Sequence, residues 1–204
     1  MVNKMKFAWL LAALAVVSAL YIDDARAEGD PEAGEPLAYT CLGCHGIEGY
    51  RNAYPSYRVP KLGGQKAAYL VAAVQGYRDG TREHPTMQAQ ANSLSDQEIE
   101  DIAAYLATLG TETVEAGGSD APAFELAATC VACHGTNGIG VSPLWPTLAG
   151  QHEEYLVAAL NQYRDGTRKD AVMVQMAAAL SDEDVRLLAR YYAGLEGLET
   201  TEKP

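Results

Sequence analysis

Two short motifs hold all four cysteines of this 204-residue chain: CLGCH at residues 41–45 and CVACH at residues 130–134. Two thiols at this spacing can be joined to each other, bind a metal ion or attach a cofactor, and each use requires a different fold around them. Because the motif occurs twice, we expect the chain to build the same site twice.

Four uses of the motif were compared. A disulfide between such near neighbours closes a very small loop and stabilises little. A thioredoxin-like redox pair follows a strand in a βαβ unit, and no such pattern precedes either motif. A zinc site needs four ligands, and each motif offers three.

A histidine directly after the second cysteine is typical of covalent haem attachment, in which two thiols bind the porphyrin and the imidazole ligates iron. We therefore predict two covalently attached haem c groups. The attachment residues are Cys41, Cys44, Cys130 and Cys133, and the proximal iron ligands are His45 and His134.

The chain beyond its first residues is an internal repeat. The hexapeptide YRDGTR occurs at residues 77–82 and again, unchanged, at residues 163–168, which is 86 residues later. At the same separation PKLGGQ (60–65) matches PTLAGQ (146–151), and LSDQEI (94–99) matches LSDEDV (180–185).

The repeat predicts two domains, residues 28–110 and residues 122–204, joined by a polar, glycine-bearing linker at residues 111–121. The cysteine motifs are 89 residues apart, so the first copy has three extra residues between its histidine and its proline. Added length of this kind is tolerated in a loop.

Each copy has the apolar periodicity of helices and no useful alternating stretch, so the predicted class is all-α. The last helices are expected to begin at Ser95 and Ser181, and the middle helices to end at the Asp-Gly of YRDGTR. With so few helices per copy, the haem must complete the core. The positions expected to be buried in the last helices are Ile99, Ile102, Ala103 and Leu106, and Val185, Leu188, Ala189 and Tyr192.

The first residues have the order of a secretory signal. Lys4 and Lys6 precede an apolar run that ends near Leu20, and small residues follow at positions 25–27. The alternative is an uncleaved anchor, but a spanning helix needs ~20 apolar residues and this run is shorter. We predict a signal peptide at residues 1–27, cleavage after Ala27 and a periplasmic protein.

The formal net charge is −12, with 27 acidic and 15 basic residues. This balance excludes nucleic acid as a partner, because phosphate binding needs clustered lysine and arginine. A protein partner that docks electrostatically would offer a basic surface, although a solvated acidic surface has the same composition.

The repeat also indicates the second iron ligand. Met87 and Met173 are 86 residues apart, and each precedes the leucine of its LSD segment by seven residues. We predict that both are distal ligands, since a thioether opposite an imidazole suits an electron carrier. Met176 aligns with Gln90 and is expected to pack in the core. His84 and His152 align with Asp170 and Lys66, so we expect surface histidines there.

Two further features have open alternatives. Pro60 and Pro146 begin matching turns, and their carbonyls are the best-placed acceptors for the outer N–H of each ligating imidazole. The tyrosine and arginine residues of YRDGTR are candidates either for binding haem propionates or for contacts between the domains.

Taken together, CxxCHG, PxLxGQ, YRDGTR, a methionine and LSD, present twice, resemble the dihaem cytochrome c4 family over essentially the whole exported chain. The resemblance implies two tandem class I cytochrome c domains, each with a few helices wrapped around a haem, packed about a pseudo-twofold axis. It also implies histidine and methionine ligation of both irons and a place in periplasmic electron transport.

We therefore expect an electron carrier of a respiratory chain, not an enzyme. It would accept electrons from a cytochrome bc1-type donor, deliver them to a terminal oxidase and associate at most loosely with the membrane. One alternative is a dihaem electron-accepting subunit of a thiosulfate or sulfide dehydrogenase. Another is a catalytic dihaem enzyme such as a peroxidase, against which two methionine candidates argue, because catalysis needs an open iron site.

Overall fold

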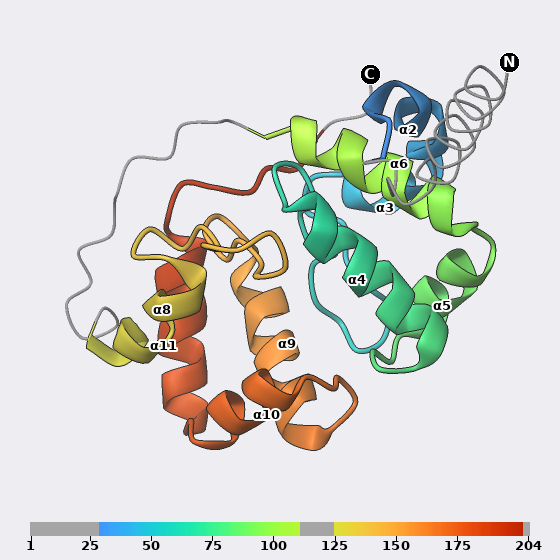
Figure 1. Ribbon diagram of the computed structural model, residues 1–204. Coiled ribbons are helices and arrows are strands. Elements are labelled where there is room, and N and C mark those ends of the chain that lie inside the picture. Colours follow the sequence, from blue (N-terminus) through green and yellow to red (C-terminus); the bar gives the residue numbers. More distant parts are fainter. Residues whose placement is uncertain (1–28, 111–124, 202–204) are drawn as a thin grey trace, which may run out of the picture.

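The computed structural model describes residues 29–110, the first unit, and residues 125–201, the second unit. Within these residues every regular element is a helix, so the predicted all-α class is confirmed. The predicted signal peptide (1–27) and linker (111–121) lie outside the described residues. Figure 1 shows the two units beside each other. The first unit contains α2 (Pro31–Leu37), α3 (Tyr39–His45), α4 (Ala67–Asp79), α5 (Pro85–Asn92) and α6 (Asp96–Thr108), and the second contains η1 (Ala127–Thr129), α8 (Val131–His134), α9 (Glu153–Asp165), α10 (Ala171–Ala178) and α11 (Asp182–Ala193).

The helix boundaries follow local chemistry that repeats between the units. Helices α6 and α11 both begin with a capping box, in which Ser95 or Ser181 exchanges hydrogen bonds with the third helical residue. Helices α4 and α9 both end at a glycine with positive φ, Gly80 at 77° and Gly166 at 83°. A side chain would be strained in that conformation, which explains why Asp-Gly closes both helices.

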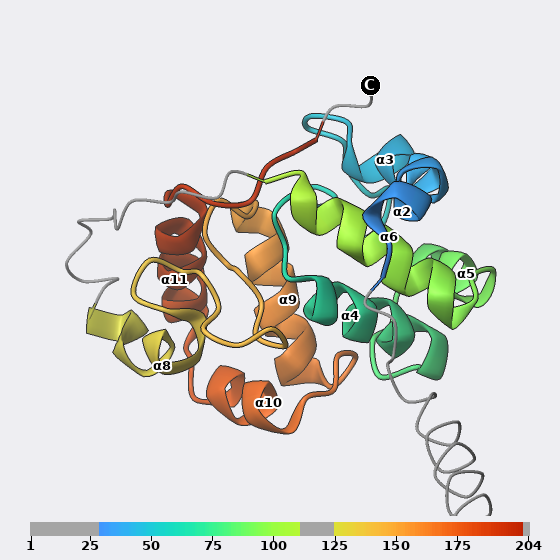
Figure 2. The ribbon, with the colours of Figure 1, turned by 45° about the horizontal axis from the view of Figure 1, so that its top comes forward.

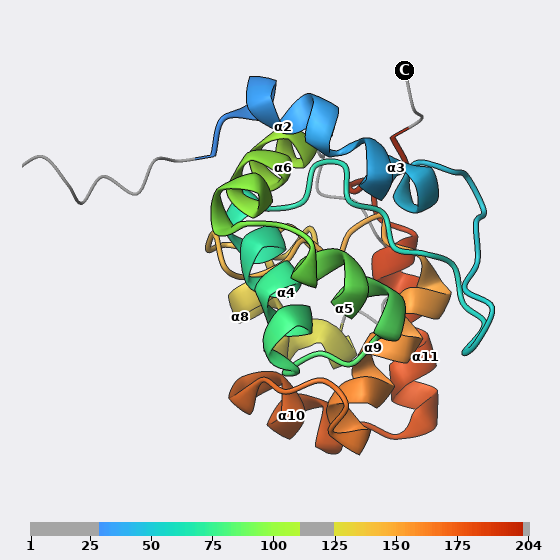
Figure 3. The ribbon, with the colours of Figure 1, turned by 90° about the vertical axis from the view of Figure 1, so that its right-hand side faces the viewer.

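Each unit is built around its last helix. In the first unit α2 lies across α6, as Figure 3 shows, and the backbone N–H of Asp30 donates to the carboxylate of Asp101. The apolar face of α6 also packs on α4 through Leu70. All eight positions predicted to be buried in α6 and α11 are buried.

The two units meet along α4 and α9, which face each other in both Figure 1 and Figure 2. The amide of Gln65 donates to the carbonyl of Thr147 (3.0 Å) and accepts from its N–H (2.9 Å). The amide of Gln151 makes the same pair of bonds with Lys61, at 3.0 and 2.9 Å. Exchanging the units turns one set of contacts into the other, which is the property of a twofold interface. The pseudo-twofold packing implied by the resemblance is therefore present.

A second pair of reciprocal contacts lies at the far ends of these helices. The N–H of Glu83 donates to the carbonyl of Thr167 (2.9 Å), and the N–H of Lys169 donates to the carbonyl of Thr81 (2.7 Å). The two YRDGTR segments thus pair antiparallel, with Arg82 opposite Arg168. Hydrogen bonds to backbone atoms therefore fix the interface at both ends.

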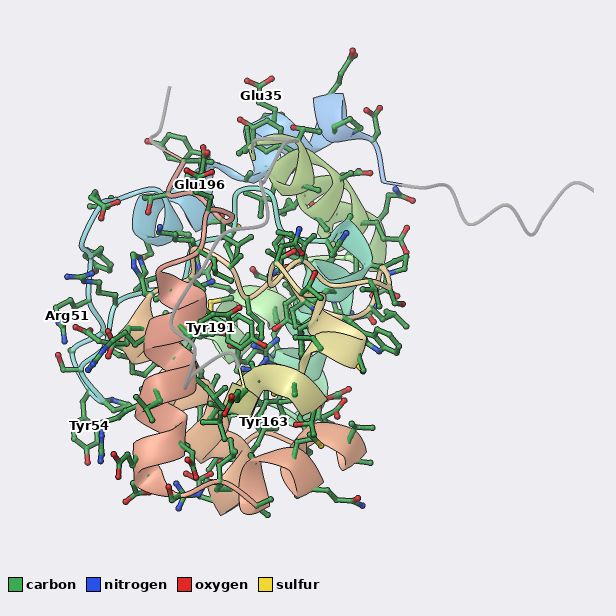
Figure 4. The ribbon with its side chains drawn as sticks, turned by 90° about the vertical axis from the view of Figure 1, so that its left-hand side faces the viewer. Glu35, Arg51, Tyr54, Tyr163, Tyr191 and Glu196 are labelled. Carbon is green, nitrogen blue, oxygen red and sulfur yellow. The ribbon has the colours of Figure 1, made fainter. Side chains whose placement is uncertain are left out.

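Two irregular segments extend this interface. Residues 46–59, the loop with the three extra residues, bring Arg51 into an ion pair with Glu154 of the second unit (2.7 Å). Figure 4 shows Arg51 on this loop. At the other end of the chain, the N–H of Glu199 donates to the carbonyl of Gly63 (3.1 Å). Among the residues with described positions, no helix is long and apolar enough to cross a membrane.

Substitution of Gln65 by alanine tests the interface. Thr147 is 3% exposed, so the variant leaves a buried N–H and a buried C=O without partners. Each orphaned group costs about 1–3 kcal/mol, and we expect the free energy of unfolding in urea to fall by at least about 2 kcal/mol. Gln175→Ala, at an exposed position of α10, is the matched control and should change it by less than about 0.5 kcal/mol. Equal effects of the two substitutions would contradict the interface described here.

Candidate functional site

The two cysteine motifs end on short helices that present their side chains in the same way. In the first unit the whole motif lies on α3, and in the second unit the motif runs from the end of η1 along α8. The motif histidine is the last residue of its helix in both units. All four thiols are free and partly exposed, so neither motif forms a disulfide.

A glycine follows each histidine, and in the second unit only glycine fits there. Gly135 has a φ of 73°, and a Cβ atom on it would lie 2.3 Å from the carbonyl oxygen of Ile139. This close approach turns the chain directly after His134, towards the loop that carries Pro146.

Both motif histidines make the hydrogen bond that a ligating imidazole requires. The Nδ1 atom of His45 lies 2.7 Å from the carbonyl oxygen of Pro60, and the Nδ1 atom of His134 lies 2.9 Å from that of Pro146. A carbonyl can only accept, so Nδ1 carries the proton and Nε2 keeps its lone pair for a metal. The prediction that these two proline carbonyls bind the imidazoles is confirmed.

Burial keeps both imidazoles neutral. It lowers the pKa of His45 and of His134, against the opposing effect of the proline carbonyl in each case. A histidine must be neutral to ligate a metal, so both side chains are in the correct protonation state at neutral pH.

The predicted distal ligands occupy equivalent positions. Met87 is the third residue of α5 and Met173 the third residue of α10. The residue before each helix caps it through that methionine: the N–H of Met87 donates to His84 Nδ1, and the N–H of Met173 donates to Asp170 Oδ1. That these methionines ligate iron remains a prediction. The backbone N–H of each one is bonded to the residue that caps its helix.

The two histidines expected at the surface are placed differently. His84 is half-buried and caps α5, the same task that Asp170 performs for α10. His152 is 9% exposed, so the expectation of a surface position was wrong for this residue. Burial lowers the pKa of His152, and the positive charges of Lys61 and Arg58 of the first unit lower it further, so this side chain lies near the first unit.

The donor chemistry fits haem attachment better than the other uses of the motif. Burial raises the pKa of Cys41 and of Cys130, whereas a redox-active pair has a lowered thiol pKa. No group of three or more His, Cys, Asp or Glu side chains within residues 29–110 and 125–201 is arranged to hold a metal ion by itself. Free thiols, a neutral imidazole and a methionine in each unit are the donors that haem c needs.

Large apolar side chains that are close to the donors in the sequence are exposed. Val172, directly before Met173, is 62% exposed, and Trp145, directly before Pro146, is 41% exposed. In the first unit Ile47, two residues after His45, is 48% exposed. Large apolar side chains next to the donors fit a large, flat, apolar group.

The arginines of the repeated YRDGTR segment separate into two pairs. Arg78 and Arg164 form ion pairs with Asp96 and Asp182, close to the surface of their own units. Arg82 and Arg168 instead lie at the interface and contact tyrosines of the opposite unit.

The sequence did not predict a role at the interface for Gln65 and Gln151. The only signal was that both PxLxGQ segments end in a glutamine.

Comparison with known proteins supports this description. The family model for Cytochrome c matches the chain twice, at residues 31–110 and 121–196. The thiosulfate dehydrogenase electron acceptor of Stutzerimonas stutzeri is 36% identical over 181 residues, which cover 81% of this chain and 83% of that protein. Cytochrome c4 of Pseudomonas aeruginosa is 34% identical over 189 residues, which cover 84% of this chain and 91% of that protein.

The fold agrees with a solved structure. The crystal structure of reduced recombinant cytochrome c4 from Pseudomonas stutzeri superposes with a TM-score of 0.66 at 32% sequence identity, and the match covers 82% of this chain and all of that chain. Two cytochrome c domains, each with a Cys-x-x-Cys-His motif, imply two covalently attached haem c groups. This chain therefore belongs to the cytochrome c family, and within it to the dihaem cytochrome c4 family.

Proposed function

We propose that this protein is a periplasmic carrier that shuttles electrons in a respiratory chain and delivers them to a terminal oxidase. One observation carries the proposal: both units have the same complete set of candidate groups. Each has two free thiols, a neutral histidine bonded to a proline carbonyl, and a methionine at the third residue of a capped helix. A catalytic dihaem enzyme needs one open iron site, so two complete sets favour a carrier.

The roles that we propose follow the motif in each unit. The thiols attach haem through thioether bonds, the histidines are proximal ligands and the methionines are distal ligands. The thioether residues are Cys41, Cys44, Cys130 and Cys133, the proximal ligands are His45 and His134, and the distal ligands are Met87 and Met173.

When bound, each haem supplies one-electron exchange between ferric and ferrous iron. The residues of the chain hold the proposed iron ligands in position. The carbonyls of Pro60 and Pro146 orient the imidazoles, and the caps of α5 and α10 fix the backbone of the methionines. The reciprocal bonds of Gln65 and Gln151 keep the two units at a constant separation.

The sequence of the first residues supports a location in the periplasm. Residues 1–27 have the charged, apolar and small-residue order of a secretory signal, and covalent haem attachment takes place outside the cytoplasm. We propose cleavage after Ala27.

A second candidate function has specific support. The relative from Stutzerimonas stutzeri is a thiosulfate dehydrogenase electron acceptor and matches 81% of this chain. This chain would then accept electrons from a sulfur-compound dehydrogenase. The ligand sets of the two candidate functions are the same, and only the partner differs.

The purified protein should be tested with both classes of partner. Reduction by thiosulfate in the presence of a thiosulfate dehydrogenase supports the second candidate, and oxidation by a terminal oxidase supports the first, both followed by haem absorbance. Because the chain carries a net charge of −12, we expect either rate to fall as salt is raised from about 10 mM to 300 mM. A rate that does not depend on ionic strength would rule out electrostatic docking.

Substitution of the proposed distal ligand tests the ligand assignment. Met87→Ala should lower the midpoint potential of one haem by roughly 0.1 V or more, since axial ligands set potentials over a range of about 0.8 V. Met176→Ala, in α10 at a position that aligns with Gln90, is the control and should leave both potentials unchanged. If Met176→Ala lowered the potential of the second haem, Met176 would replace Met173 as the proposed distal ligand of the second unit. The measurement is a redox titration followed by optical spectra.

Removal of one attachment site tests the dependence of each unit on its haem. The double variant Cys41→Ala with Cys44→Ala should carry one haem per chain, and its first unit should become sensitive to protease because its buried apolar side chains form only a small core. The corresponding variant of Cys130 and Cys133 is the matched control and should make the second unit sensitive to protease instead. Undiminished protease resistance of the first unit would show that it folds without haem.

A further inference from the structure

One position in the core of the second unit differs in chemistry from its counterpart in the first. The repeat aligns Tyr192, near the end of α11, with Leu106 of α6, because the two are 86 residues apart. Both side chains are only 3% exposed. The second unit therefore has a phenol hydroxyl in its core where the first unit has only hydrocarbon.

Close packing fixes the ring of Tyr192. A Cβ atom on Gly138 would lie 3.1 Å from Cδ1 of Tyr192, so the glycine leaves space that the ring fills. Around Gly49, which follows the first motif at the same distance, that space is open. The ring of Tyr191 meets that of Tyr192 edge-on, with 5.1 Å between the centres, and Figure 4 labels Tyr191. The backbone carbonyl of Tyr192 accepts from the N–H of Gly150 (2.9 Å), so the ring and the backbone are both held.

The hydroxyl of Tyr192 lies beside the sulfur atom of Cys130, the first thiol of the second motif. Cys130 packs against the same apolar cluster that contains Tyr192. No nitrogen or oxygen atom within residues 29–110 and 125–201 forms a hydrogen bond with this buried hydroxyl. The sulfur atom is therefore the polar neighbour that the core offers it.

The hydroxyl would be the donor of this pair once a haem is attached. Burial raises the pKa of Tyr192, and the neighbouring Cys130 raises it further, so the phenol keeps its proton. A thiol can donate or accept, whereas a thioether sulfur has no hydrogen and can only accept. An O–H···S hydrogen bond is weak, but a buried hydroxyl gains from it because leaving the group unbonded is costly.

The equivalent thiol of the first unit lacks such a donor at this position. Cys41 packs against the apolar cluster that contains Leu106, and a leucine side chain cannot form a hydrogen bond. Both thiols also have a threonine neighbour, Thr40 or Thr129, which the two units share. The tyrosine is therefore an addition to the second attachment site and not a part of the motif.

We propose that Tyr192 is a positioning residue of the second haem site, whose hydroxyl donates to the thioether sulfur of Cys130 and raises the midpoint potential of that haem. This inference rests on the proposed function, because it requires a haem attached at Cys130. An O–H dipole with its positive end towards the haem stabilises the ferrous state, which carries one more electron. Hydrogen bonds and polarity around a haem are known to adjust its potential.

The variant Tyr192→Phe tests the proposal in the full-length protein with both haems. Phenylalanine keeps the ring and removes only the hydroxyl, so the packing around Gly138 should be retained. We expect the midpoint potential of the second haem to fall, with a change of about threefold or more in the equilibrium constant between its oxidised and reduced forms, where tenfold is 59 mV for one electron. NMR contacts between each haem and the protons of its cysteines assign the two potentials to their units.

Tyr191→Phe is the matched control, because Tyr191 is the adjacent tyrosine and is also buried, at 5% exposed. It should change the equilibrium constant of either haem by less than about 1.5-fold, and so should Tyr192→Phe for the first haem.

A second measurement separates a hydrogen bond from packing. The carbon–sulfur stretching region of the resonance Raman spectrum is recorded in water and in heavy water, where the hydroxyl proton exchanges for deuterium. A band that shifts with deuterium in the wild-type protein and in Tyr191→Phe should lose that shift in Tyr192→Phe. Altered packing could move the bands of the variant, but it would not remove their dependence on deuterium.

Either of two results would overturn the inference: a second-haem potential in Tyr192→Phe equal to or above that in Tyr191→Phe, or the same deuterium shifts in all three proteins. Tyr192 would then be a packing residue alone. Failure of the proposed function looks different, because the peptide of the unmodified protein that contains Cys130 would lack haem, or neither class of partner would exchange electrons with the protein.

Discussion

Each unit depends on the hydrogen bond from the motif histidine to a proline carbonyl. The bond joins His45 to Pro60 and His134 to Pro146, and so links the end of a short motif helix to the turn before α4 or α9. It fixes the tautomer, leaves Nε2 available for iron, and makes burial of the imidazole tolerable. The same turn continues into the interface, because Gln65 and Gln151 end the PxLxGQ segments that Pro60 and Pro146 begin. The ligand geometry and the packing of the units therefore share one segment of backbone.

Much of this arrangement could be predicted from the sequence because local chemistry determines it. Ser95 and Ser181 cap their helices through neighbouring residues, and the Asp-Gly pairs close α4 and α9 by a conformation that glycine alone adopts freely. The repeat then aligned each motif with its twin, which identified the proline carbonyls. Predictions of this kind need only residues that are close in the chain or equivalent between its two copies.

The contacts between the units could not be predicted in the same way. Gln65 and Gln151 bond to backbone atoms, and nothing in the sequence marks which backbone they reach. His152 was expected at the surface because it aligns with a lysine, yet it is buried near charged residues of the first unit. Arg78 and Arg82 stand four residues apart in one hexapeptide, and only the fold shows that the first turns to its own unit and the second to the interface.

The repeat makes the two sites alike in their donors but not in their surroundings. Position 106 of α6 is a buried leucine, while the equivalent position of α11 is the buried Tyr192, whose hydroxyl lies beside the thiol of Cys130. The first unit covers α6 with α2, and its longer loop carries the ion pair of Arg51 with Glu154. Since histidine and methionine are proposed as ligands in both units, a difference between the two potentials must come from such surroundings. An acceptor that meets one unit before the other would then encounter two electrostatically distinct sites built from the same motif.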